Sequence, residues 1–168
     1  MLAENIFTQT VLNSWKAVSR RIDDLAVKFP AEHFDARVAP DGNRVVYLFG
    51  HLAVAHDRMF TLLRIGKRLH PELDDAYFDN PDRTFPDPMS PADLTAALNE
   101  IHIALNRAFD ALAPADWLQR HSEVAEAEFT ENPTRNRLAI LLSRTNHASL
   151  HTGQIVSTKL TLQRHVGQ

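Results

Sequence analysis

Four segments of the chain carry apolar residues at alternating steps of three and four, and this spacing limits the fold more than any other feature of the sequence. The segments are residues 5–29, 44–65, 91–113 and 134–163. Apolar residues with the 3.6-residue helical period lie on one side of a helix, which is buried against other helices. Pro30 and Pro114 end the first and third segments. We therefore predict an all-α four-helix bundle that occupies residues 1–168 as a single domain.

The connection between the second and third predicted helices is too long for a tight helical hairpin. A segment of this length can carry the chain back along the bundle, as a long crossover connection that leaves helices two and three parallel. Long loops in compact domains often cover functional pockets. We favour the plainer alternative of a surface excursion that Tyr77, Phe78 and Phe85 attach to the bundle. The connection, residues 67–89, is acidic and contains the prolines Pro71, Pro81, Pro86 and Pro88.

The composition excludes several classes of function. The net charge of −3 and the lack of a long basic run argue against nucleic-acid binding. The sequence has no cysteine, so a metal would be held by nitrogen and oxygen ligands only. It has no apolar run of signal-peptide or membrane-spanning length. We therefore expect a cytoplasmic protein that has no nucleic-acid or membrane partner.

His147 and His151 are the first candidate ligands. They are four residues apart in the last predicted helix, so they lie on one face, one turn apart. Two imidazoles in this arrangement can bind one transition metal, although the motif lacks the glutamate of the HExxH zinc proteases. The strip from Ile140 to Thr158 that contains them is polar in its middle, so it faces solvent or lines an internal cavity. Gly153 in the same helix would be explained by a closely packed neighbouring helix or ligand.

His51 is the candidate third ligand, because it lies on the apolar stripe of the second predicted helix. A histidine that faces a bundle core needs partners for its ring nitrogens, and either a metal or a buried hydrogen bond can supply them. Taken alone, the hydrogen bond is the simpler interpretation. His56 is rotated away from the face of His51 and is expected at the surface. His102 lies beside the stripe of the third helix and is expected to pack at the boundary of the bundle.

The bundle would bring these histidines together if its second and last helices face each other. Three neutral imidazoles would then hold a divalent metal and leave its other positions open to substrate or water. Arg144 and Gln154 lie on the same face of the last helix. Arg144 could orient a substrate, but we favour a surface salt bridge. Gln154 could orient a substrate or form a hydrogen bond to a ligand histidine, whereas Asp57 is rotated too far from His51 to be a ligand.

Two segments resemble the DinB-like superfamily: Phe49-Gly-His51-Leu-Ala-Val-Ala-His-Asp57, and Asn146-His147-Ala-Ser-Leu-His151-Thr-Gly-Gln154-Ile. The family's usual ending has an arginine where this sequence has Thr152. The resemblance implies a four-helix bundle with a three-histidine site at His51, His147 and His151. It also implies a divalent metal, often nickel or zinc, and frequently a homodimer. Some relatives are S-transferases or isomerases that use a low-molecular-weight thiol.

The sequence and the resemblance together predict a metal-dependent enzyme, a thiol-dependent S-transferase or a hydrolase acting on a small-molecule substrate. The alternative is a non-catalytic, metal-binding dimeric bundle with a stress-related or interaction role. A weaker alternative, DNA association in the response to damage, is disfavoured by the net charge. The sequence does not identify the catalytic residues.

Overall fold

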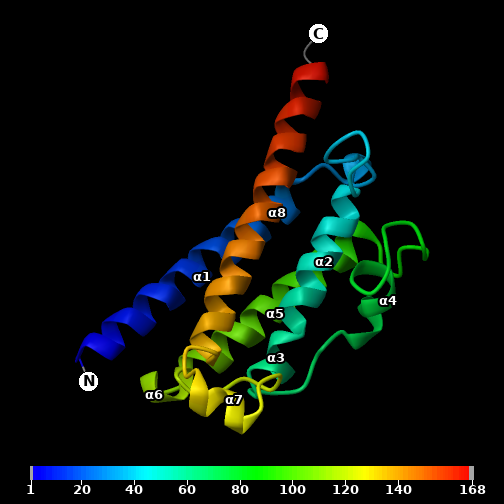
Figure 1. Ribbon diagram of the computed structural model, residues 1–168. Coiled ribbons are helices and arrows are strands. Elements are labelled where there is room, and N and C mark those ends of the chain that lie inside the picture. Colours follow the sequence, from blue (N-terminus) through cyan, green and yellow to red (C-terminus); the bar gives the residue numbers. More distant parts are fainter. Residues whose placement is uncertain (1, 167–168) are drawn as a thin grey trace.

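A computed structural model describes residues 2–166 of the chain as an all-α four-helix bundle (Figure 1). The four long helices are α1 (Leu2–Lys28), α2 (Val45–Asp57), α5 (Pro91–Asp110) and α8 (Arg137–Val166). The described residues form no β-sheet, and none of their helices is long and apolar enough to cross a membrane. The predicted fold class is therefore confirmed.

The connections between the long helices contain short helical segments. One 3₁₀ turn, η1 (Ala31–His33), follows α1, and the helix α3 (Met59–Leu62) continues the direction of α2 (Figure 1). The crossover connection contains η2 (Pro71–Leu73) and α4 (Asp74–Tyr77), and it returns the chain so that α5 runs parallel to α2. Two more short helices, α6 (Pro114–Trp117) and α7 (Glu126–Glu131), lie between α5 and α8.

The second helix is the central element of the core. All its residues except the half-buried His51 are buried, because it packs against α5, α8 and the crossover connection. The predicted helix 44–65 is divided at Arg58, and its end differs from the prediction. The segment ends before residue 65, where Arg64, with a φ of 55°, adopts a left-handed conformation.

Most residues of the crossover connection are exposed or half-buried, as expected for a surface excursion, but its short helices are anchored in the core. Leu73 and Tyr77 are fully buried, and both short helices of the connection pack against α2. The predicted attachment holds for Tyr77 and Phe78, which pack beside α2, whereas Phe85 is 44% exposed. Burial of these side chains fixes the connection against the side of α2 that carries His51.

Gly50 permits the close approach of Tyr77 to α2, and we predict that Gly50→Ala destabilises the protein. A Cβ atom at this position would lie 2.3 Å from Cγ of the buried Tyr77 ring. Overpacking of this kind costs about 1–3 kcal/mol, which outweighs the gain in helix propensity of about 1 kcal/mol. The free energy of unfolding in urea should therefore fall.

Gly153→Ala is the matched control, because Gly153 also lies within a helix. A Cβ atom there would meet no atom of a neighbouring element within 4 Å, so the described part of the chain does not supply the predicted close neighbour of Gly153. We expect this variant to be as stable as the wild type or more stable by up to about 1 kcal/mol. A Gly50→Ala variant that behaves like Gly153→Ala would contradict the prediction.

Candidate metal centre

The three predicted ligand histidines converge between α2 and α8. Nε2 of His147 lies 3.1 Å from Nε2 of His51 and 3.1 Å from Nε2 of His151. One nitrogen from each ring lies within 4.8 Å of the other two, and all three side chains are half-buried. His51 and His147, which are 96 positions apart in the sequence, thus direct their Nε2 atoms toward one point between the helices.

The spacing of these nitrogens suits a common metal ion. Ligands about 2.0–2.1 Å from zinc are separated by about 3.3–3.4 Å in a tetrahedron and by about 2.9 Å at right angles. The observed separations of 3.1 Å lie between these two values. A compact cluster of histidines without cysteine also matches the borderline metals that imidazole prefers. The three residues therefore form a cluster that could hold a divalent metal ion.

Hydrogen bonds on the far sides of two rings direct their lone pairs toward the centre. Nδ1 of His51 lies 3.1 Å from the backbone oxygen of Tyr77, and Nδ1 of His151 lies 2.7 Å from Oε1 of Gln154. Since both partners are acceptors, both Nδ1 atoms carry the proton, and both Nε2 atoms keep their lone pairs. The contact predicted between Gln154 and a ligand histidine is present.

Aromatic rings hold His51 in position. The imidazole lies nearly parallel to the rings of Tyr47 and Phe78, with centroids 6.1 and 5.1 Å away. The crossover connection therefore supplies both a hydrogen-bond acceptor and a flat apolar neighbour for His51. This contact gives the connection a direct part in the site.

Burial favours the neutral form of two histidines of the cluster, His147 and His51. Burial, together with the charges of His151, His51 and Arg144, lowers the pKa of His147 to about 4. Burial also lowers the pKa of His51, although its hydrogen bond to the backbone of Tyr77 opposes this effect. Neutral imidazole is the form that binds metal, so these two ligands need not lose a proton before binding near pH 7.

The lowered pKa values predict that acid destabilises the metal-free protein. The unfolded chain binds protons at these histidines below about pH 6.5, whereas the folded chain binds one at His147 only near pH 4. The free energy of unfolding should therefore fall as the pH decreases between these values, by at most about 2 kcal/mol at pH 5 for His147. Urea unfolding at pH 7.5 and pH 5 measures the change.

Other titratable groups limit this pH window. Burial raises the pKa of Asp74 and Asp82, but their hydrogen bonds to arginines lower it overall. The stability that these two carboxylates contribute to the folded protein is therefore lost only below about pH 3.8. Burial lowers the pKa of His70, but Glu72 and Glu100 raise it overall. Protonation of His70 therefore stabilises the folded protein as the pH falls, which opposes the effect of His147. His147→Gln should reduce the pH dependence. Equal free energies of unfolding of the wild type at pH 7.5 and pH 5 would contradict the prediction.

Arg144 is not a surface salt-bridge partner, contrary to the alternative that we favoured. Its side chain is half-buried, it forms no salt bridge among residues 2–166, and its buried Nε atom has no hydrogen-bond partner there. Burial lowers the pKa of its guanidinium group. The charge of Arg144 also lowers the pKa of His51 and His147, so it lies within electrostatic range of the cluster.

Asp57 is fully buried but has a different function from metal binding. Its carboxylate accepts hydrogen bonds from Nε of Arg68 at 3.0 Å and from the backbone nitrogens of Leu69 and His70 at 2.7 and 3.1 Å. These bonds attach the start of the crossover connection to the end of α2. The prediction that Asp57 is no ligand agrees with this arrangement.

Two histidines occupy places that the sequence did not predict. His56 and His102, expected at the surface and at the bundle boundary, are 0% and 1% exposed. Nδ1 of His56 lies 2.8 Å from Nε2 of His102, and Nδ1 of His102 lies 2.6 Å from Oδ1 of Asp23 in α1. The lack of any charged residue in α2 before Asp57 was the available signal, because such a helix is buried on all sides.

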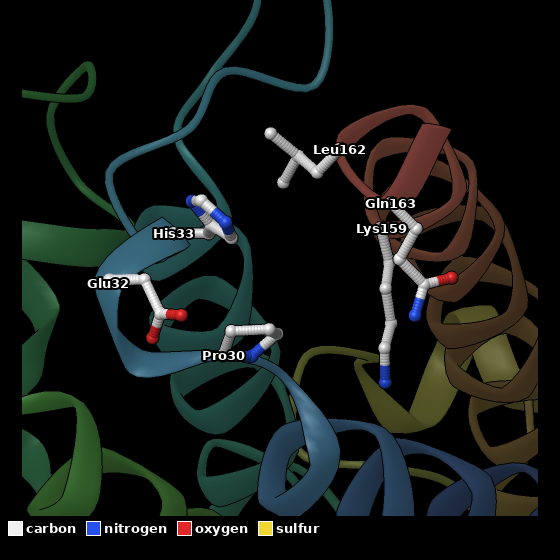
Figure 2. Close-up of a pocket in the computed structure, with 6 residues that line it drawn as sticks. All are labelled: Pro30, Glu32, His33, Lys159, Leu162 and Gln163. Atoms are coloured by element: carbon white, nitrogen blue, oxygen red, sulfur yellow. The ribbon is translucent and has the colours of Figure 1, made fainter. Parts of the chain in front are cut away.

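A surface pocket of about 270 Å³ lies elsewhere, between η1 and the end of α8 (Figure 2). Pro30, Glu32 and His33 form one wall, and Lys159, Leu162 and Gln163 form the other. The ammonium group of Lys159 is bound to the backbone oxygen of Lys28 at 2.7 Å, so it is not directed at a ligand. This pocket does not contain the histidine cluster.

The fold and the cluster define an all-α bundle protein with three histidines that could hold a metal ion. The sequence pattern of the DinB superfamily matches residues 14–155, and the chain belongs to this superfamily. No curated protein matches the sequence significantly. A solved structure, described as a conserved protein from Enterococcus faecalis, is similar in fold: it has 20% sequence identity and a TM-score of 0.60, and the match covers 90% of this chain and 94% of that chain.

Proposed function

We propose that the protein is a metal-dependent enzyme whose metal, nickel or zinc, is held by His51, His147 and His151. The observation that carries the proposal is the convergence of three half-buried rings, in which Nε2 of His147 lies 3.1 Å from Nε2 of both other histidines. A divalent metal on three neutral imidazoles supplies Lewis-acid activation of a thiol or of water. The reactions that we propose are thiol-dependent S-transfer and, as the second choice, hydrolysis of a small molecule.

The residues around the cluster have distinct roles in this proposal. Tyr77 and Gln154 hold the protons on the outer nitrogens of His51 and His151, so that both rings keep lone pairs for the metal. Arg144, a half-buried cation without a salt-bridge partner among the described residues, orients an acidic group of the substrate or the thiol. In S-transfer, the thiol sulfur bonds to an electrophilic carbon, its proton passes to solvent, and the leaving group departs with the bonding electrons.

Metal analysis followed by a turnover assay tests the proposal. The protein should be purified without a metal-affinity tag and analysed for metals before and after reconstitution with nickel or zinc. Cysteine and glutathione then serve as thiols, and monochlorobimane as the electrophilic acceptor. We expect stoichiometric metal and a metal-dependent rate above that of the free thiol, both lost in His151→Ala. Failure to bind either metal after reconstitution would overturn the proposal.

The alternative function is a metal-binding bundle without turnover, in a stress-related or interaction role. One observation favours it: among the described side chains, no carboxylate joins the three histidines to serve as a general base close to the metal. Stoichiometric metal without turnover of any thiol and acceptor pair would support this alternative over the enzyme.

We also propose that the protein is a homodimer that associates through α8 and the neighbouring part of α1. The exposed residues of α8 from 139 to 160 include Leu142, Leu150 and Leu160 and no charged side chain. Ile6 and Phe7 of α1, which packs against α8, are 57% and 70% exposed. Depletion of charged residues around exposed large apolar side chains is typical of the centre of a protein interface.

Leu150→Glu tests this surface, because it places a charge at a side chain that is 61% exposed. In sedimentation equilibrium we expect a dimeric wild type and a folded, monomeric variant. Ile103→Glu is the matched control on α5, where Ile103 is 55% exposed, and it should remain dimeric. A monomeric wild type would contradict the proposal.

A further inference from the structure

A buried chain of hydrogen bonds links α1, α5 and α2 behind the histidine cluster. Asp23 of α1 contacts His102 of α5, and His102 contacts His56 of α2. Trp15 lies edge-on to both imidazoles, with ring centroids 4.8 and 5.8 Å away. Burial of two imidazoles costs free energy unless their ring nitrogens form hydrogen bonds. A ring nitrogen without a partner in this series of hydrogen bonds therefore needs an explanation.

The direction of each hydrogen bond follows from the carboxylate at the start of the chain. Asp23 can only accept, so His102 donates from Nδ1. When the His102 ring carries a single proton, on Nδ1, its Nε2 accepts a hydrogen bond and His56 donates that bond from Nδ1. This order leaves a lone pair on Nε2 of His56, which is buried and has no partner among the described residues.

The ligand His147 lacks a hydrogen-bond acceptor for its outer nitrogen, Nδ1. The outer nitrogens of His51 and His151 have acceptors, whereas Nδ1 of His147 is buried and has none among the described residues. When Nε2 of His147 binds a metal, its Nδ1 carries a proton and requires an acceptor. Leaving this donor unpaired would cost about 1–3 kcal/mol.

The fold places His56 on the same helix as a ligand that contacts His147, because His56 follows His51 in α2 and Nε2 of His51 lies 3.1 Å from Nε2 of His147. Burial and His102 lower the pKa of His56 most, and the next contribution comes from His147, ahead of those from Arg144 and His51. Nε of Arg144 is a third buried nitrogen without a partner among residues 2–166. One buried water typically forms about three hydrogen bonds, so it can accept from Arg144 and His147 and donate to His56.

We infer that Asp23, His102 and His56 form a relay of hydrogen bonds that positions the ligand His147, with one water between His56 and His147. The relay gives His147 the outer acceptor that Tyr77 and Gln154 give to the other two ligands. His56, His102 and Asp23 are positioning residues, because they act on the metal through His147. The inference rests on the proposed metal site, but the state of His56 can be measured without metal.

The first test determines which nitrogen of the His56 ring carries the proton in the wild-type protein. Long-range ¹H–¹⁵N correlation spectra of metal-free and zinc-loaded protein at pH 8 distinguish the two tautomers of each histidine. We expect the proton of His56 and that of His102 on Nδ1 in both samples. A proton on Nε2 of His56 would remove the acceptor and overturn the inference. The metal-free sample decides this even if zinc does not bind, so it separates this inference from the proposed function.

The second test measures the effect of the relay on metal affinity. In competition with a chromophoric chelator, His56→Leu should bind zinc about 10–100-fold more weakly. His56→Gln can place an amide oxygen near the former Nε2 position and should recover most of the affinity. Asp23→Ala, which removes the start of the relay, should also weaken binding, whereas Asp24→Ala at the exposed neighbouring position should not.

These variants separate positioning from general damage to the fold. Circular dichroism identifies which variants are folded, and Asp23→Ala provides the measurement if His56→Leu does not fold, because Asp23 is the most exposed member of the relay. Recovery by His56→Gln would not be expected if His56 only filled space. Wild-type zinc affinity in folded His56→Leu, or in folded Asp23→Ala, would overturn the inference.

Discussion

Replacing His147 with alanine should abolish stoichiometric metal binding and leave the protein folded. His147 is the central member of the cluster, since its Nε2 atom lies 3.1 Å from Nε2 of both other histidines. Zinc bound to four protein ligands gains about 10–16 kcal/mol, or about 2.5–4 kcal/mol for each ligand. The loss of one ligand from three should therefore weaken binding by about 70-fold to 1,000-fold.

Elemental analysis after gel filtration, together with chelator competition, measures this loss. The metal-free variant should remain folded, because the ring is only half-buried and its Nδ1 atom has no hydrogen-bond partner among the described residues. His33→Ala is the control: His33 lies in the pocket between η1 and α8, outside the histidine cluster. A His147→Ala variant that retains one tightly bound metal per chain would place the metal elsewhere.

The positions of the three clustered histidines could be predicted because helical geometry is local and regular. Spacing alone put His147 and His151 on one face of the last helix, and the apolar pattern put His51 toward the core. The parallel arrangement of α2 and α5 followed from the length of the connection between them. The resemblance to the superfamily then joined residues from two helices, which no local pattern could do.

The environment of the site could not be predicted in the same way. A periodic pattern identifies a buried face, but it assumes that the opposite face is exposed. The crossover connection covers part of α2, and α5 covers the side that carries His56, so polar residues there are buried. The contact of Tyr77 with His51 depends on where the connection packs, which composition and proline content do not determine.

Arg44→Met should lower the free energy of unfolding by about 3–5 kcal/mol, the cost of breaking a buried ion pair by removing one partner. The Arg44 side chain is 8% exposed and pairs with Asp35, Asp82 and Asp87. Two parallel hydrogen bonds of 2.7 and 2.9 Å join it to Asp87, and one of 2.9 Å joins its Nε to Asp82. Because Asp82 and Asp87 belong to the crossover connection, the substitution should also loosen the segment that holds His51.

The pH dependence of this variant distinguishes a lost ion pair from a lost packing contact. Burial raises the pKa of Asp82, but its bonds with Arg44 lower it overall. Without Arg44, burial should dominate and raise that pKa above 3.8. The folded variant would then take up a proton at a higher pH than the unfolded chain does. Its deficit in the free energy of unfolding relative to the wild type should therefore shrink as the pH falls from 7 toward 4.

Urea unfolding at several pH values measures this deficit. The control is Arg37→Met, at an exposed position of the same loop, which we expect to lie within about 0.5 kcal/mol of the wild type. A deficit for Arg44→Met below about 1 kcal/mol at pH 7 would mean that the connection is held in place by its apolar side chains alone.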